Sequence, residues 1–289
     1  MRVAAVQMRV GASKDENVAR ALRLIDEAAG RGARLIMLPE YVTYMGPPSA
    51  YAAIAEPIPG PTSRLFAAKA REHGVVIHGG SLVKPIAEAR PFAASAARFH
   101  NTSFVVDPSG AISGVYRKVH LFDVSVDADV NECESADIVP GDGLVTVELA
   151  GLVLGMSICY DLRFPEVYRA LALAQATVMA VPAAFAAATG GAHWEVLLRA
   201  RAIENGAFVV AAAQHGTGAA WPMHGHSMIV DPWGVVLAEL PAGDGVIMAE
   251  IDPAQAERRR RQIPVLASRR PGVYAGPVRK GRLAFCEEM

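Results

Sequence analysis

The chain has 289 residues, of which 52% are hydrophobic and 20% are charged, and its formal net charge is −1. This composition is that of an ordinary globular protein, and the near-zero charge gives no reason to expect nucleic acid or an anionic membrane as a partner. No apolar stretch reaches the ~18 residues of a membrane span. Because the three cysteines form no metal motif or disulfide framework and the N-terminus lacks a signal-peptide pattern, we expect a cytoplasmic protein.

Short apolar runs rich in β-branched residues alternate with amphipathic stretches along the chain. The first expected strand covers 3–8, and apolar positions at helical spacing predict a helix over 15–29. Further strands are expected at 34–38, 75–79, 102–106, 152–158, 177–181, 208–213, 226–230 and 246–251, and further helices at 62–72, 165–174 and 193–205. The sequences PSG at 108–110 and DPWG at 231–234 are typical of hairpin turns.

The alternation of strands and helices indicates an α/β fold. Since several strands are joined by short turns, we expect mixed sheets rather than purely parallel ones. No linker rich in proline, glycine or serine divides the chain, so we expect one domain over 1–260. The segment 261–289 has no clear period and is expected to be a tail that crosses to a partner subunit.

Three residues with reactive side chains follow strand-like runs. Glu40 comes after RLIMLP, Lys118 after GVYR, and Cys159 after LVLGMSI. Taken singly, each has an ordinary explanation as a helix cap, a surface charge and a core thiol. Reactive groups gather at the carboxyl ends of strands in α/β sheets, however, so the three together predict a shared site.

Carboxylate, amine and thiol are sufficient for acyl transfer without a metal or cofactor. A thiol becomes a strong nucleophile when a base removes its proton during attack. A carboxylate can be that base if partial burial raises its pKa. A lysine ammonium can stabilise the oxyanion that forms next.

Histidines provide a rival chemistry. A Cys–His pair could involve His120, His193 or His226, although spacing marks none of them. A zinc site at His224 and His226 is disfavoured, because alternate residues of a strand point to opposite sides.

Three segments resemble, in order, the signature segments of the nitrilase superfamily, the carbon–nitrogen hydrolases. They are LPE at 38–40, YRKVHLFD at 116–123 and CYDLRFPE at 159–166. Their separations also match, with 78 residues from Glu40 to Lys118 and 41 from Lys118 to Cys159. The resemblance extends from AAVQM near the start to IPVLASRRPGVY near the end.

The resemblance implies roles for particular residues. Glu40 would be the general base, Lys118 the oxyanion-stabilising residue and Cys159 the nucleophile. The backbone N–H of Tyr160 would complete the oxyanion hole. No cofactor is implied.

A second glutamate and a fold are also implied. Of Glu132 and Glu134 in NECES, the family's Glu-Ser pair falls on Glu134, which would orient Lys118 and the substrate amide. The family fold is a four-layer α-β-β-α sandwich that forms a homodimer through helices near the nucleophile, and the C-terminal tail commonly reaches across to the partner.

The expected substrate follows from the branch that the chain resembles. Cys-Tyr-Asp at the nucleophile, together with GAHWEVLLRARAIENG and GHSMIVDPWG, resembles the branch of omega-amidase and deaminated glutathione amidase. This implies hydrolysis of a small, carboxylate-bearing linear amide through a thioester, with release of ammonia. The alternatives are an N-carbamoyl amine or amino acid hydrolase, a nitrilase, and a catalytically silent binding or scaffold member.

Several smaller expectations accompany this assignment. Asp161 and Arg163 are expected to form a salt bridge that holds the turn behind the nucleophile. Phe185 is expected to line the pocket, with core packing as the alternative, and the segment 43–60 to help shape it. Cys133 and Cys286 are expected to be non-catalytic thiols.

Overall fold

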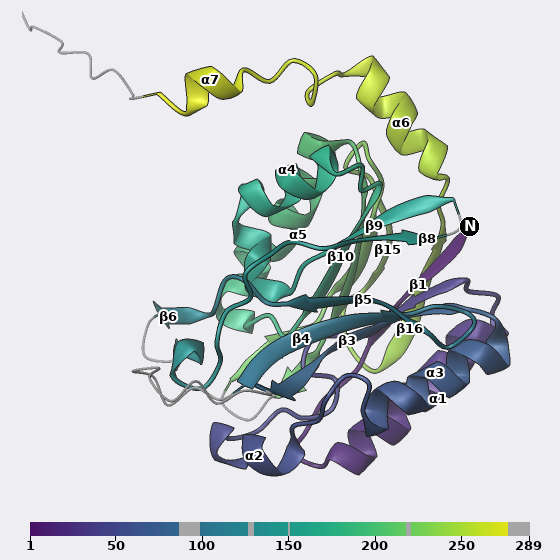
Figure 1. Ribbon diagram of the computed structural model, residues 1–289, viewed down its shortest axis with the longest axis vertical. Helices are drawn as coiled ribbons and strands as arrows, with labels where there is room; N and C mark the ends of the chain where they lie inside the picture. Colours follow the sequence, from purple (N-terminus) through teal and green to yellow (C-terminus); the bar gives the residue numbers. More distant parts are fainter. Residues whose placement is uncertain (87–98, 127–129, 150, 218–220, 277–289) are drawn as a thin grey trace, which may run out of the picture.

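Two six-stranded sheets pack face to face, and helices cover both outer faces, so the molecule has four layers (Figure 1). The computed structural model describes residues 1–86, 99–126, 130–149, 151–217 and 221–276. The first sheet contains, in spatial order, β16 (Gly245–Glu250), β1 (Arg2–Gln7), β2 (Leu35–Met37), β3 (Val76–Pro85), β4 (Phe99–Val106) and β5 (Ile112–Arg117). The second contains β15 (Val236–Leu240), β14 (Ser227–Val230), β11 (Phe208–Ala213), β10 (Val178–Ala183), β9 (Leu152–Met156) and β8 (Thr146–Leu149).

Each sheet has parallel central strands and antiparallel edges. The strands β1, β2 and β3 pair in parallel, as do β9, β10 and β11, whereas β16, β4, β5, β8, β14 and β15 pair antiparallel. Two short ribbons add β6 (Asp123–Val126) with β7 (Val130–Cys133), and β12 (His215–Thr217) with β13 (Pro222–His224). The expected single-domain α/β fold with mixed sheets is confirmed.

The helices are divided between the two outer faces. Helices α1 (Lys14–Gly30) and α3 (Pro61–His73) cover the first sheet, and α4 (Pro165–Leu173) and α5 (Ala187–Asn205) cover the second. The short helix α2 (Tyr51–Ile54) lies beyond the end of β3. Helix α6 (Pro253–Gln262) packs on the body through Arg260, and α7 (Pro271–Tyr274) leads away from it (Figure 1). In the described part of the chain, no helix has both the length and the apolar character needed to span a bilayer.

The apolar pattern of β1 explains the layers. Val3 and Ala5 pack in the core between the two sheets, whereas Ala4 and Val6 pack against α1 and α3. Because strands of this kind are buried on both faces, they are continuous hydrophobic runs rather than alternating ones. The central strands could therefore be predicted from the sequence, although their observed ends differ from the predicted ends by a few residues.

Several elements differ from expectation. Helix α5 begins at Ala187 rather than at residue 193, and β6, β7, β8, β12 and β13 were not expected. The turns at Asp107–Gly110 and Asp231–Gly234 close the β4–β5 and β14–β15 hairpins, as predicted. Helix α6 crosses the expected boundary at residue 260, and Cys286 lies outside the described residues.

A buried histidine in β3 makes the fold sensitive to acid. His78 is completely buried, its Nδ1 accepts the Gly80 N–H at 3.3 Å, and its Nε2 lies 3.0 Å from the Ser103 hydroxyl. Burial lowers the pKa of His78 to about 4. The unfolded chain therefore binds a proton that the folded chain excludes between about pH 6.5 and pH 4, so stability falls as the pH falls through this window.

We expect the free energy of unfolding to lose up to about 3 kcal/mol from this residue between pH 6.5 and pH 4. Urea unfolding of the wild type and of His78→Gln across that range measures the difference. His193→Gln is the matched control, since His193 is exposed. An unchanged pH dependence in His78→Gln would contradict this assignment.

Candidate active site

Both sheets contribute to one buried constellation. Glu40 follows β2 and Lys118 follows β5 in the first sheet, whereas Cys159 follows β9 in the second. The Nζ of Lys118 lies 2.9 Å from Oε1 of Glu40 and 2.8 Å from Oε2 of Glu134. All four residues are buried. The structure thus brings together the four charged or nucleophilic side chains that the sequence singled out.

The Glu40 carboxylate is held in a fixed orientation. Its Oε1 accepts hydrogen bonds from Lys118 and from Nδ2 of Asn101 at 2.9 Å each, and its Oε2 accepts the Ala184 N–H at 2.8 Å. The side chain of Gln214 donates to the Glu40 backbone carbonyl at 2.8 Å. With Oε1 occupied twice, Oε2 is the oxygen available to exchange a proton with Cys159.

Glu134, rather than Glu132, contacts the lysine. Its Oε1 accepts the Tyr41 hydroxyl at 2.8 Å, and its Oε2 accepts the Phe122 N–H at 2.8 Å in addition to Lys118. Glu132 is half-buried at the pocket wall, where burial and the nearby Glu134 raise its pKa. The structure therefore places Glu134, and not Glu132, against the Lys118 ammonium.

The site holds an ammonium and a neutral thiol. Burial alone would lower the pKa of Lys118, but Glu134 and Glu40 raise it well above its usual range, so the amine stays protonated. Burial, followed by the Glu40 carboxylate, raises the pKa of the Cys159 thiol well above its usual range, while Lys118 acts in the opposite direction. The thiol is therefore protonated at rest and needs a base at the moment of attack.

A tight turn presents the nucleophile. Cys159 has φ of 43° where β9 passes into a 3₁₀ helix, Cys159–Arg163. A left-handed backbone is uncommon for a residue other than glycine, and such strain concentrates at functional positions. Tyr160 is the second residue of this helix, where backbone N–H groups lack partners within the helix. Its ring lines the pocket.

The expected salt bridge between Asp161 and Arg163 is wrong. Asp161 is completely buried and accepts hydrogen bonds from the Tyr116 hydroxyl at 2.7 Å, the Ile158 N–H at 2.9 Å and Nδ1 of His120 at 2.8 Å. In a 3₁₀ helix of three residues per turn, positions two apart point in different directions. Asp161 therefore does hold the turn, but through Tyr116, His120 and the Ile158 N–H rather than through Arg163.

Arg163 instead faces the pocket. Its Nη1 lies 3.0 Å from Nδ1 of His193, its Nη2 donates to the Thr189 hydroxyl at 3.1 Å, and its guanidinium carbon lies 5.1 Å from the centre of the Phe185 ring. Phe185 lines the pocket and also packs on Trp194, with 5.0 Å between the ring centroids, so it belongs both to the pocket wall and to the core.

The pocket measures about 1030 Å³, counting the open solvent at its mouth. Glu40, Lys118 and Cys159 lie in its wall, and aromatic side chains form much of the remainder. The segments 45–48 and Tyr51 also line it, so part of the stretch 43–60 shapes the pocket as expected.

Comparison with known proteins bears on this geometry. The sequence model described as "Carbon-nitrogen hydrolase" matches residues 2–261. The chain belongs to the carbon-nitrogen hydrolase family. Among curated relatives of this hydrolase, deaminated glutathione amidase of Synechocystis sp. is 40% identical over 271 residues, which cover 92% of this chain and 97% of that protein. Omega-amidase NIT2 of Homo sapiens is 34% identical over 280 residues, covering 96% and 98%.

Solved structures of similar proteins share the fold of this hydrolase. Nit3 of Saccharomyces cerevisiae, a member of branch 10 of the nitrilase superfamily, has a TM-score of 0.80 at 28% identity, covering 92% of this chain and 94% of that one. An amidase variant from Nesterenkonia sp. AN1 has a TM-score of 0.77 at 25% identity, covering 95% of each chain. That variant carries the acetamide moiety of fluoroacetamide covalently on its active-site cysteine.

The histidines of the hydrolase do not support a Cys–His pair. His120 contacts Asp161, His193 contacts Arg163, and His226 pairs with Glu239 at 2.5 Å. None of these three histidines lies in the pocket wall.

The expectation that His224 and His226 point to opposite sides is wrong. Their rings stack with centroids 4.3 Å apart. The strand β13 ends at His224, and Gly225 and His226 have φ of 73° and 55°, which turns the second ring back onto the first.

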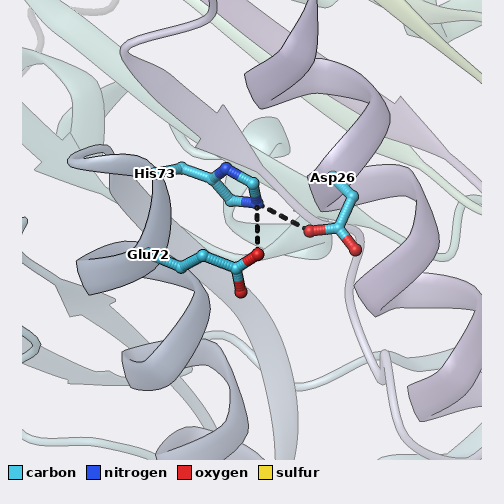
Figure 2. A group of neighbouring side chains, drawn as sticks. All are labelled: Asp26, Glu72 and His73. Carbon is cyan, nitrogen blue, oxygen red and sulfur yellow. Dashed lines mark hydrogen bonds and ion pairs between the residues drawn. The ribbon is translucent and has the colours of Figure 1, made fainter.

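One cluster in the described part of the hydrolase has three side chains at metal-ligand spacing (Figure 2). None of the three lines the pocket. The imidazole of His73 in α3 points toward Asp26 of α1 and Glu72, at 2.7 and 3.8 Å. The Lys69 ammonium already lies 2.8 Å from Asp26 and 3.0 Å from Glu72. With a cation of the protein's own between the carboxylates, the cluster is an ion-pair network that joins α1 to α3.

Sequence reasoning missed four groups around the catalytic set: the Tyr41 hydroxyl, the Asn101 amide, the Ala184 N–H and the Trp221 ring in the pocket wall. Tyr41 directly follows Glu40, so its position next to a candidate site was a usable signal. Nothing in HNTSFVV marks Asn101, since its partner Glu40 is 61 residues away.

Proposed function

We propose that this protein is an amidase that hydrolyses small linear amides carrying a carboxylate, through a thioester on Cys159. The observation that carries the proposal is the buried cluster in which Lys118 forms ion pairs with both Glu40 and Glu134. This cluster lies beside the Cys159 thiol, in one pocket with Arg163. These residues supply a base, a fixed cation and a nucleophile, which are the groups that acyl transfer needs.

Acylation requires one proton transfer in each direction. Oε2 of Glu40 takes the thiol proton as Sγ of Cys159 attacks the amide carbon. The Lys118 ammonium and the Tyr160 N–H stabilise the oxyanion of the tetrahedral intermediate. Glu40 then returns the proton to the nitrogen, the C–N bond breaks, and ammonia leaves.

Deacylation uses the same base. Glu40 removes a proton from water, and the resulting hydroxide attacks the thioester carbonyl. The C–S bond breaks, the carboxylic acid is released, and the proton held by Glu40 returns to the Cys159 thiolate. Glu134 takes no proton in this scheme and keeps Lys118 in position.

The choice of substrate rests on Arg163 and on the relatives. A guanidinium in an aromatic pocket is well suited to bind a carboxylate through paired hydrogen bonds. Deaminated glutathione amidase and omega-amidase are the names of the curated relatives. We therefore propose deaminated glutathione or the omega-amide of a 2-oxo acid as the substrate type.

Replacing Arg163 by glutamine is expected to raise KM for a carboxylated amide about 10-fold or more while changing kcat little, because the contact acts equally on the ground and transition states. The assay measures ammonia release from deaminated glutathione, 2-oxoglutaramate, neutral aliphatic amides, N-carbamoyl compounds and nitriles. KM for the neutral amides should not change, and Arg64→Gln on the exposed face of α3 is the control.

The outcomes separate the alternatives. An equal loss on neutral and carboxylated amides would exclude Arg163 as the carboxylate-binding group. Turnover of nitriles alone would make the protein a nitrilase, and no turnover with any compound would favour the silent binding member.

A second candidate is an N-carbamoyl amine hydrolase. Glu132 and Asp137 line the same pocket, both half-buried, and no ion pair involves either of them within the described residues. Two carboxylates of this kind favour a positively charged group on the substrate. Faster turnover of N-carbamoyl amines than of carboxylated amides in the same assay would favour this candidate.

We also propose a homodimer in the cytoplasm. Val196 and Ile203 on α5 and Trp233 in the β14–β15 turn are 66%, 52% and 50% exposed, and apolar side chains grouped this way are typical of subunit contacts. Helix α6 packs on the body through Arg260, which donates to the Asn205 and Ala176 carbonyls, and the segment after α6 is proposed to reach the partner. Cys133 and Cys159 are free thiols, as expected in a reducing compartment. Light scattering of the purified protein tests the dimer.

A further inference from the structure

One neutral side chain contacts both carboxylates of the catalytic set. The Nδ2 of Asn101 in β4 donates to Oε1 of Glu40 at 2.9 Å and to Oε1 of Glu134 at 3.2 Å. Its backbone carbonyl accepts the Lys118 N–H at 2.9 Å. We propose that Asn101 is a positioning residue that holds Glu40 and Glu134 on either side of Lys118; this inference rests on the proposed function.

The carboxylates dictate the orientation of the amide. An asparagine side chain has two donors on its nitrogen and only acceptors on its oxygen. If the amide were flipped, its oxygen would face the two Oε1 atoms of Glu40 and Glu134, and three acceptors would meet without a proton. The nitrogen therefore faces the carboxylates and donates one hydrogen to each.

A neutral donor suits this position better than a charged one. Hydrogen bonds to a carboxylate favour its ionised form, and two carboxylates around one ammonium need donors beyond Lys118. A second cation would stabilise the Glu40 anion so strongly that it would become a weak base. An amide supplies the donors and leaves the charge of the cluster unchanged.

The other end of the same side chain makes no hydrogen bond. Asn101 is completely buried, and its Oδ1 has no hydrogen-bond partner among the described residues. An unsatisfied buried acceptor is destabilising. The hydrogen bonds of this side chain are therefore those that its nitrogen donates to the two carboxylates.

Asn205 in α5 provides a matched control. It is also completely buried, its Nδ2 donates to the Arg201 carbonyl at 2.9 Å, and its Oδ1 likewise has no partner among the described residues. It is not part of the pocket wall. If Asn101 had only a structural role, replacing it should affect the protein in the same way as replacing Asn205.

The experiment compares Asn101→Leu and Asn101→Ser with Asn205→Leu and Asn205→Ser. We expect Asn101→Leu to lower kcat about 10- to 100-fold with KM nearly unchanged, and to move the acid limb of kcat/KM upward by about one pH unit. Asn101→Ser should change kcat and the acid limb of kcat/KM in the same directions but to a smaller extent. The Asn205 variants should keep the wild-type kcat and pH profile, whatever happens to their Tm.

A second readout does not depend on the substrate. Carbon-13 NMR of protein labelled at the glutamate carboxyl carbons follows the ionisation of Glu40 directly, with Glu40→Gln used to assign its signal. The Glu40 signal in Asn101→Leu should titrate at higher pH than in the wild type. This readout remains valid if the wild type hydrolyses none of the amides tested, so failure of the proposed function is distinguishable.

Two results would overturn the proposal. The first is a folded Asn101→Leu protein with wild-type kcat, pH profile and Glu40 titration. The second is a failure of both Asn101 variants to fold while both Asn205 variants fold, which would assign a structural role.

Discussion

Replacing Cys159 by alanine is expected to lower kcat by about 10⁴-fold or more, because no other group can form the thioester. The fold should persist, since the change removes one sulfur atom from a strained turn. Ammonia release measures the loss, and mass spectrometry of enzyme quenched during turnover should detect an acyl adduct on the wild type but not on the variant.

The matched control for this prediction is Cys133→Ala. Cys133 is exposed, its sulfur lies 3.6 Å from the Ser135 hydroxyl, and it is not part of the pocket wall. This variant should retain wild-type kcat. An active Cys159→Ala enzyme, or an acyl adduct on Cys133, would exclude the proposed mechanism.

Replacing Lys118 by methionine is expected to affect both activity and stability. Activity should fall about 10³-fold or more, since the cation facing the oxyanion is lost. The variant also leaves Glu40 and Glu134 buried without the ammonium between them, and removing one partner of a buried ion pair costs about 3–5 kcal/mol. Urea unfolding measures the second effect.

Lys69→Met is the control for the stability change. Lys69 also lies between two carboxylates, those of Asp26 and Glu72, but this cluster is on the surface of α1 and α3. Exposed ion pairs are worth about 0–1 kcal/mol. Equal losses in the two lysine variants would show that the buried triad has no special electrostatic role.

Most of the fold could be predicted from the sequence, because the central strands are buried on both faces and are therefore continuous apolar runs. Runs such as RVAAVQ and FVVAAA, short and rich in apolar residues, are typical of interior strands. The predicted helix was shorter than α5, because tertiary packing determines the sequence of its first turns. Its first turns include Thr189-Gly190-Gly191, a poor helix sequence, yet a Cβ on Gly190 would lie 2.2 Å from Cγ of His224, so close packing requires glycine there.

The candidate catalytic set could be proposed from the sequence because three reactive side chains each follow a strand. The groups that hold them could not. Asp161 has its donors on β5 and on the segment after it, and Asn101 reaches Glu40 across 61 residues of sequence. Contacts of this kind depend on strand pairing and on the packing of two sheets, which local patterns do not encode. The expected salt bridge between Asp161 and Arg163 is wrong for the same reason, because residues that are close in sequence need not be in contact in space.

The division of the site between the two sheets has a consequence for the folding pathway. The first sheet supplies Glu40 and Lys118, and the second supplies Cys159, so neither sheet alone contains a nucleophile with its base. The contacts that join these residues span long stretches of chain, and contacts of high sequence separation form late. During synthesis, the thiol emerges from the ribosome after the other two residues and is paired with its base only when the sheets dock. Recovery of activity on refolding therefore reports the final docking step rather than the formation of either half.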